Sequence, residues 1–151
     1  MDFKNKKVLV CGMAKSGISA AELMAHMGAD VTLQDKKEYK DLGDVSYIEK
    51  QGIKILSGKN PDEEIKNFDF IVVSPGIPSS LPFFEIADKA GIPVLSEVEL
   101  SYRLTPCPVA AITGTNGKTT TTTLAGEIIK KKYPNRSEER RVGKECRSRW
   151  S

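Results

Sequence analysis

The stretch from residue 7 to residue 35 constrains the fold of this chain most strongly. It begins with a continuous apolar run, Lys7–Cys11, which is typical of a central strand in a parallel sheet. A glycine-containing turn then leads into residues 16–27, whose apolar spacing predicts a helix ended by Gly28. A second apolar run follows and ends in Asp35. This order predicts a β-α-β unit, and therefore an α/β fold built on a parallel sheet.

The turn inside this unit has the composition of a phosphate-binding loop. It reads Gly-Met-Ala-Lys-Ser-Gly and nearly matches the glycine pattern of dinucleotide-binding proteins. Ala14 stands where that pattern has the glycine that lets a pyrophosphate approach most closely, whereas Lys15 and Ser16 add side-chain donors. The turn therefore predicts a phosphate at the helix N-terminus without specifying the nucleotide. An NAD-binding oxidoreductase stays open as an alternative, as does a tight turn with no ligand.

The remainder of residues 1–105 alternates predicted strands and helices, as in a Rossmann-like domain. Further strands are expected at residues 53–56, 68–73 and 92–95. Helices are expected at residues 41–51, 61–67 and 81–90, and after Ser96. Pro93 lacks an amide donor, which favours an edge strand, and Ser96 with Glu99 has the spacing of a helix cap. The proline-rich residues 105–108 predict a domain boundary.

A short loop with two prolines follows the predicted strand at residues 68–73. It reads Ser74-Pro75-Gly76-Ile77-Pro78, and its prolines make it stiff and non-helical. In open α/β sheets, ligands bind beyond the carboxyl ends of the strands, where this loop lies. It is therefore a candidate for ligand binding, with a structural connector as the alternative.

A second strand–loop–helix pattern occupies residues 109–132. An apolar run at 109–112 predicts a buried strand, and residues 113–120 read Thr-Gly-Thr-Asn-Gly-Lys-Thr-Thr before a predicted helix. The glycines let the backbone approach a phosphate, and the helix N-terminus supplies amide donors. Lys118 suits the β- and γ-phosphates of ATP, and the Thr119 hydroxyl suits Mg²⁺. This pattern predicts the first β-loop-α of a P-loop ATPase domain, with ATP and Mg²⁺ as cofactors.

Residues 113–120 resemble the ATP loop of the Mur ligase and folylpolyglutamate synthase superfamily. The loop at residues 12–19, Gly-Met-Ala-Lys-Ser-Gly-Ile-Ser, resembles the opening loop of its D-glutamate-adding branch, and residues 74–78 resemble a UDP-sugar loop of Mur ligases. The resemblance implies an ATP-dependent ligase that adds D-glutamate to UDP-N-acetylmuramoyl-L-alanine through an acyl phosphate, in peptidoglycan precursor synthesis. It also implies that this chain is an N-terminal fragment without ligase activity of its own. A Mur-type ligase for another amino acid remains open.

The resemblance also implies the site residues, position by position. Lys118 and Thr119 are the expected catalytic residues, and Thr119 the expected Mg²⁺ ligand. The expected ATP-binding residues are Gly114, Thr115, Asn116, Gly117, Lys118, Thr119 and Thr120. The expected residues for the UDP substrate are Lys15, Ser16, Gly17, Asp35, Lys36, Ser74, Pro75 and Gly76.

The net charge of +3 comes from the end of the chain. Of the 23 Lys and Arg, six lie after residue 135, and of the 20 Asp and Glu, three do, so residues 1–135 carry no net charge. This balance gives no reason to expect binding to nucleic acid or to a membrane, and we expect a cytoplasmic monomer. Residues 136–151 resemble a translated DNA-sequencing adapter and are expected to be an artefact, with a natural basic tail as the alternative. The expected domains are residues 1–105 and 106–135.

Overall fold

The computed structural model describes residues 3–106 and 108–132. The chain divides into two compact units, Met1–Pro106 and Cys107–Ser151, which are described separately. The predicted artefact at residues 136–151 lies outside the described residues.

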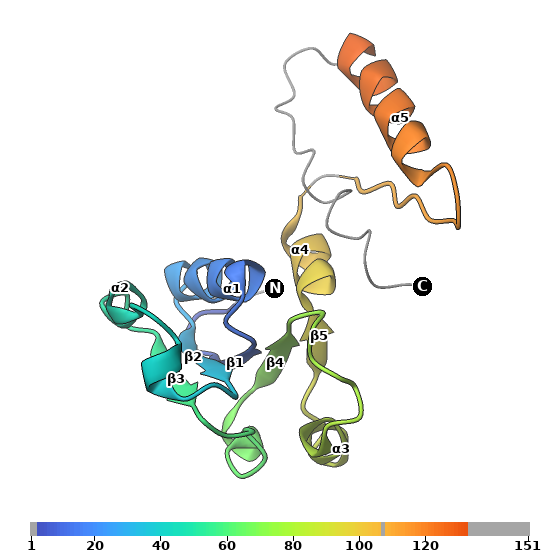
Figure 1. Cartoon of the computed structure of the whole chain (residues 1–151). Helices are drawn as coiled ribbons and strands as arrows, with labels where there is room; N and C mark the ends of the chain where they lie inside the picture. Colours follow the sequence, from blue (N-terminus) through green and yellow to red (C-terminus); the bar gives the residue numbers. More distant parts are fainter. Residues whose placement is uncertain (1–2, 107, 133–151) are drawn as a thin grey trace. The chain divides into compact units, whose positions relative to one another are not determined.

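The first unit is a parallel five-stranded sheet with helices on both faces, so the α/β prediction is confirmed (Figure 1). Its strands are β1 (Lys7–Cys11), β2 (Asp30–Asp35), β3 (Lys54–Ser57), β4 (Phe70–Val73) and β5 (Val94–Ser96). Its α-helices are α1 (Lys15–His26), α2 (Ser46–Glu49), α3 (Pro82–Lys89) and α4 (Glu97–Leu104), with 3₁₀ turns η1 (Tyr39–Asp41) and η2 (Ile65–Asn67). The strand order is β3-β2-β1-β4-β5, and Val10 of β1 lies between Leu33 and Val72.

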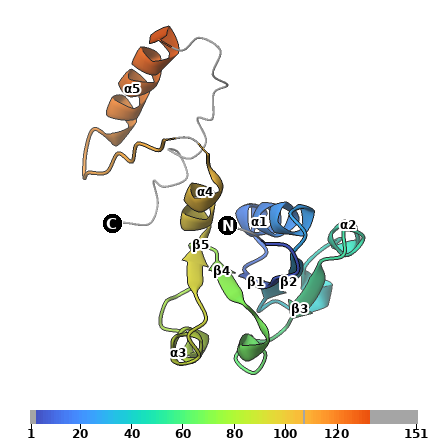
Figure 2. The ribbon, with the colours of Figure 1, turned by 180° about the vertical axis from the view of Figure 1, so that it is seen from behind.

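Alternate residues of the strands build two cores, one on each face of the sheet. Val8 and Val10 point into a cluster with Met24 of α1, Ile48 of α2 and Leu100 of α4. Leu9 and Cys11 point the other way, into a cluster with residues of α3 and η2. The view from behind in Figure 2 shows α1 and α3 on opposite sides of the sheet. Because both faces are covered, β1 is apolar on both, as its uninterrupted run predicted.

The two sequence signals near β5 are confirmed. Pro93 precedes β5, which is an edge strand of the sheet, so the missing amide donor removes no bond from an interior ladder. The Ser96 hydroxyl accepts a hydrogen bond from the Glu99 amide at 3.1 Å and so caps α4.

The helix predicted at residues 41–51 is wrong. The structure has only the 3₁₀ turn η1 and the single turn of α2 in this region. Gly43 adopts a φ of +76°, which a right-handed helix does not allow, and the Asp44 carboxylate accepts from the Ser46 amide at 3.0 Å. This side-chain bond starts a new turn at residue 46, so the apolar spacing across 41–51 does not correspond to one continuous helix.

Cys11 lies at the end of β1 with no exposed surface, and burial raises the pKa of its thiol from 9.0 to about 12. Its thiolate population at pH 8 is therefore about a thousandfold below that of an unfolded chain.

In a C107S/C146S variant we expect iodoacetamide to label Cys11 rapidly in guanidinium chloride and at least about a hundredfold more slowly in buffer. The raised pKa also predicts that the contribution of Cys11 to the free energy of unfolding does not change below pH 9 and becomes less favourable to the folded state as pH rises from 9 towards 12. Equal labelling rates in both conditions would contradict the burial.

The second unit contains one helix, α5 (Lys118–Lys132), among its described residues. The strand predicted at residues 109–112 is wrong, because this segment has no strand structure and Val109 is exposed. A strand needs a neighbouring strand to take up its backbone hydrogen bonds, and no described segment of this unit provides one. The helix predicted after residues 113–120 is present as α5, and without the strand the P-loop ATPase domain stays a prediction. In neither unit is any described helix both long enough and apolar enough to span a membrane.

Candidate functional site

The predicted loops of the first unit meet beyond the carboxyl ends of the strands. The turn 12–17 follows β1 and the loop 74–78 follows β4, and these two neighbouring strands continue to opposite faces, through α1 and α3. Such a point, where the connections change face at the carboxyl ends of parallel strands, forms the usual ligand crevice of an open α/β sheet.

Ser74 packs directly against the turn 12–17. A Cβ atom on Gly12 would lie 2.9 Å from both Cβ and Oγ of Ser74, and one on Gly17 would lie 3.0 Å from the same Oγ. Gly12 also has a φ of +104°, and a Cβ on Gly17 would lie only 2.0 Å from the Gly12 carbonyl oxygen. Both glycines of the sequence pattern are therefore required by packing inside the protein, in addition to any approach by a ligand.

The N-terminus of α1 is suited to an anion. Its N-cap residue, Ala14, has no side-chain acceptor, so the first-turn amides of Lys15, Ser16 and Gly17 have no capping group. No acidic residue lies in the first turn of α1, and the side chains of Lys15 and Ser16 are exposed. Amide donors, a helix dipole and an ammonium group at one place favour a phosphate.

Asp35, at the end of β2, is bonded within the protein. One carboxylate oxygen accepts from the Met13 amide at 3.0 Å, and the other accepts from the Lys37 amide at 3.0 Å. Asp35 therefore ties the turn 12–17 to the loop after β2. Lys36 is exposed beside it. Another tie comes from Gln34, whose buried Nε2 donates to the Lys59 carbonyl at 2.7 Å.

Replacing Asp35 tests the structural part of its role. We expect Asp35→Ala to lower the free energy of unfolding by about 2 kcal/mol, since two amide donors lose a charged acceptor. Asp35→Asn, which keeps one carbonyl oxygen, should lose about half as much. Urea unfolding followed by circular dichroism measures both, with Asp41→Ala as the control for an exposed carboxylate. If Asp35→Ala lowers the free energy of unfolding no more than Asp41→Ala does, the two hydrogen bonds of Asp35 do not stabilise the fold.

Both glycines of the loop 113–120 in the second unit adopt backbone angles that other residues rarely adopt. Gly114 has a φ of +146° and Gly117 a φ of +77°, so a side chain at either position would be strained. The Lys118 ammonium donates to the carbonyl of Gly114 and, at 3.3 Å, to that of Thr115, which holds it over the loop. The helix α5 starts at Lys118, so its first-turn amides, including those of Thr119 and Thr120, have no intrahelical acceptor.

The family model for the N-terminal domain of MurD-like Mur ligases matches residues 6–96. The chain belongs to this MurD-like family. UDP-N-acetylmuramoylalanine–D-glutamate ligases are among its relatives, one from Enterococcus hirae at 47% identity over 127 residues and one from Streptococcus pneumoniae strain G54 at 50% over 128 residues. These matches cover 83% and 84% of this chain, and the chain spans only 28% of the length of either relative. The family resemblance seen in the sequence motifs is confirmed.

Solved structures of two peptide ligases superpose on this chain. A pseudomurein peptide ligase type C from Methanothermus fervidus superposes with a TM-score of 0.55 at 28% identity, covering 85% of this chain and 27% of that one. The murein peptide ligase Mpl from Psychrobacter arcticus superposes with a TM-score of 0.58 at 24% identity, covering 83% and 26%. The latter likeness concerns the fold alone.

The first unit contains one residue bonded to the predicted loops that the sequence reasoning missed. Glu97, the first residue of α4, accepts a hydrogen bond from the Ser74 hydroxyl. In the sequence, residues 96–99 appeared only as a helix cap. The signal that could have identified Glu97 is its position directly after β5, since the carboxyl ends of parallel strands share one edge with the loops 12–17 and 74–78.

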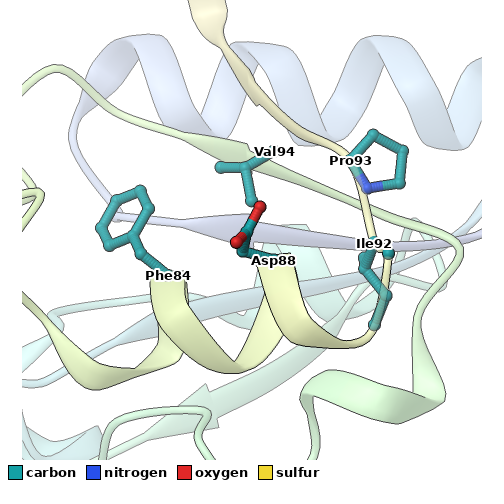
Figure 3. A pocket seen from close by; sticks show the side chains of 6 residues that line it. Phe84, Asp88, Ile92, Pro93 and Val94 are labelled. Atoms are coloured by element: carbon teal, nitrogen blue, oxygen red, sulfur yellow. The ribbon is translucent and has the colours of Figure 1, made fainter.

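A pocket elsewhere on the first unit does not fit the predicted UDP ligand. It has a volume of about 490 Å³ and lies between α3 and the start of β5, at the opposite end of the strand from Glu97. Figure 3 shows Phe84 and Asp88 of α3 facing Ile92, Pro93 and Val94. The side chains that line it are apolar apart from one carboxylate, so no side chain of the pocket donates a hydrogen bond to a phosphate. Among the described residues, no group of three or more His, Cys, Asp or Glu could hold a metal ion.

Proposed function

We propose that this chain is the N-terminal part of an ATP-dependent ligase that joins D-glutamate to UDP-N-acetylmuramoyl-L-alanine. The observation that carries the proposal is the 47–50% identity to ligases of that name over more than four-fifths of the chain. A match over 127 of the 151 residues extends past residue 120 wherever it begins, so it includes the loop 113–120, and the family model at residues 6–96 includes the turn 12–17. In the Mpl and pseudomurein ligase structures the matched chain is likewise a fraction of a longer protein.

In this proposal the first unit binds the UDP part of the acceptor substrate. The amides of Lys15, Ser16 and Gly17 and the Lys15 ammonium would bind the diphosphate. Asp35 and Lys36 would border the uracil, and Pro75 and Gly76 would contribute backbone groups from the opposite loop. The open N-terminus of α1 supports this assignment, because nothing in the first turn competes with an anion.

The loop 113–120 would bind ATP in the complete enzyme. Its backbone amides and the Lys118 ammonium, already held over the loop by carbonyl groups, would contact the phosphates. The exposed Thr119 hydroxyl at the start of α5 is an oxygen ligand of the kind Mg²⁺ accepts, and the ion would neutralise phosphate charge. The γ-phosphoryl group would pass to the carboxylate of the acceptor, with ADP as the leaving group. The amine of D-glutamate would then attack this acyl phosphate, form the amide bond and release inorganic phosphate and a proton.

Calorimetry on the chain itself tests substrate binding. We expect UDP-N-acetylmuramoyl-L-alanine to bind and NADH not to bind. The methyl group of Ala14 stands where dinucleotide-binding proteins have a glycine, and it keeps the pyrophosphate of NADH from the backbone. Binding of NADH alone would overturn the proposal in favour of an oxidoreductase.

A chimera tests the reaction. Residues 1–132 would be joined to the part of the Enterococcus hirae relative that follows its matching 127 residues. We expect phosphate release that requires ATP, UDP-N-acetylmuramoyl-L-alanine and D-glutamate together, and none from the present chain alone. Phosphate release that is independent of D-glutamate would contradict the assigned specificity.

A further inference from the structure

Glu97 joins the start of α4 to the loop after β4. Its carboxylate accepts the hydrogen bond of the Ser74 hydroxyl, across 23 residues of sequence. Ser74 has only 6% of its surface exposed and Glu97 is half-buried, so water competes weakly for this bond. A charged acceptor for a buried hydroxyl makes the bond stronger than one between neutral groups.

Ser74 is also the contact between the two ligand-facing loops. Its Oγ atom lies against Gly17, and its Oγ and Cβ atoms lie against Gly12. Its backbone amide donates to the Cys11 carbonyl at 3.0 Å, which joins the loop 74–78 to the end of β1. The hydroxyl that Glu97 holds therefore sits where the turn 12–17 and the loop 74–78 meet.

A serine hydroxyl can donate one hydrogen bond, and here it donates that bond to the Glu97 carboxylate. The bond selects one orientation of the Ser74 side chain, in which Oγ lies close to Gly12 and Gly17. Without the carboxylate, Ser74 would be a buried donor without its acceptor. It would then turn towards the backbone of the turn 12–17 and change the spacing of the loops.

We propose that Glu97 is a positioning residue of the UDP-substrate site, which acts through Ser74 to hold the turn 12–17 and the loop 74–78 at the separation that the diphosphate requires. The identity of the ligand in this inference rests on the proposed function. The role of Glu97 in holding the two loops rests on the contacts alone.

Calorimetric titration of the chain with UDP-N-acetylmuramoyl-L-alanine tests the inference. We expect Glu97→Ala to weaken binding about tenfold. Glu97→Gln keeps a side-chain carbonyl that accepts from Ser74, and should bind within about threefold of the wild type. The matched control is Glu99→Ala, which removes an acid of the same helical turn that pairs with Arg103 and leaves Ser74 untouched. Equal affinity of the Glu97→Ala and Glu99→Ala variants would overturn the inference.

Amide chemical shifts of the ligand-free variants separate this inference from the proposed function. Glu97→Ala should shift the amides of Gly12, Gly17 and Gly76, whereas Glu99→Ala should not. Ser74→Ala should shift the same amides, and adding Glu97→Ala to it should cause little further change. If the wild type fails to bind the UDP substrate, the substrate assignment is wrong, and these shifts still decide the role of Glu97. Unchanged shifts in Glu97→Ala would overturn that role.

Discussion

Gly17→Ala is expected to lower the free energy of unfolding of the first unit by about 3 kcal/mol or more. Gly17 lies in the first turn of α1, where alanine has no conformational penalty and has the higher helix propensity. Its Cβ, however, would lie 2.0 Å from the Gly12 carbonyl oxygen, a backbone atom that cannot rotate away. Relief requires Gly12 and Gly17 to move apart, which changes the shape of the turn 12–17 and its packing against Ser74. Urea unfolding followed by circular dichroism measures the change.

The control for this experiment is Gly126→Ala in α5, where no heavy atom lies within 4 Å of the added Cβ. We expect it to leave the unfolding of the first unit unchanged and to favour α5 by up to about 1 kcal/mol. If Gly17→Ala unfolds at the same urea concentration as the wild type, the packing of the turn against Ser74 is wrong. Calorimetry should also show that Gly17→Ala has lost its affinity for the UDP substrate, because the amides of the turn are displaced.

Lys118→Ala in the chimera is expected to reduce kcat/KM for ATP about a thousandfold. The Lys118 ammonium is held over the loop by two backbone carbonyls, at the place where developing phosphate charge needs a cation. Because the segment is exposed, the substitution should leave the unfolding of the present chain within about 0.5 kcal/mol of the wild type. Phosphate release by the chimera measures the activity.

Lys131→Ala is the matched control, since it removes a lysine from the last turn of the same helix. We expect it to retain most of the activity. If Lys118→Ala keeps more than about a tenth of the wild-type activity, the assignment of this loop to the ATP phosphates is contradicted. Equal losses in the two variants would indicate a general effect of charge on α5.

Much of the first unit follows from local sequence. The apolar run of β1 predicted a strand buried on both faces, because every residue after Lys7 is apolar, and Val8–Cys11 are all buried. Gly28, with a φ of +87°, ends α1 where the apolar spacing stops. The loops at residues 12–17 and 74–78 were recognised because glycines and prolines allow or require particular backbone angles. These are properties of single residues and of short-range spacing, and the sequence alone therefore determines them.

Other features depend on tertiary contacts. The apolar run at 109–112 has the composition of a strand and forms none, because a strand exists only with a neighbour to bond to. The order β3-β2-β1-β4-β5 brings Ser74 against Gly12 and Gly17, and sets Glu97 beside Ser74. No spacing rule predicts such a bond between residues 23 apart. The sequence by itself determined the family, the strands of the first unit and the phosphate-suited loops, whereas only the packing of the sheet decided which side chains hold those loops together.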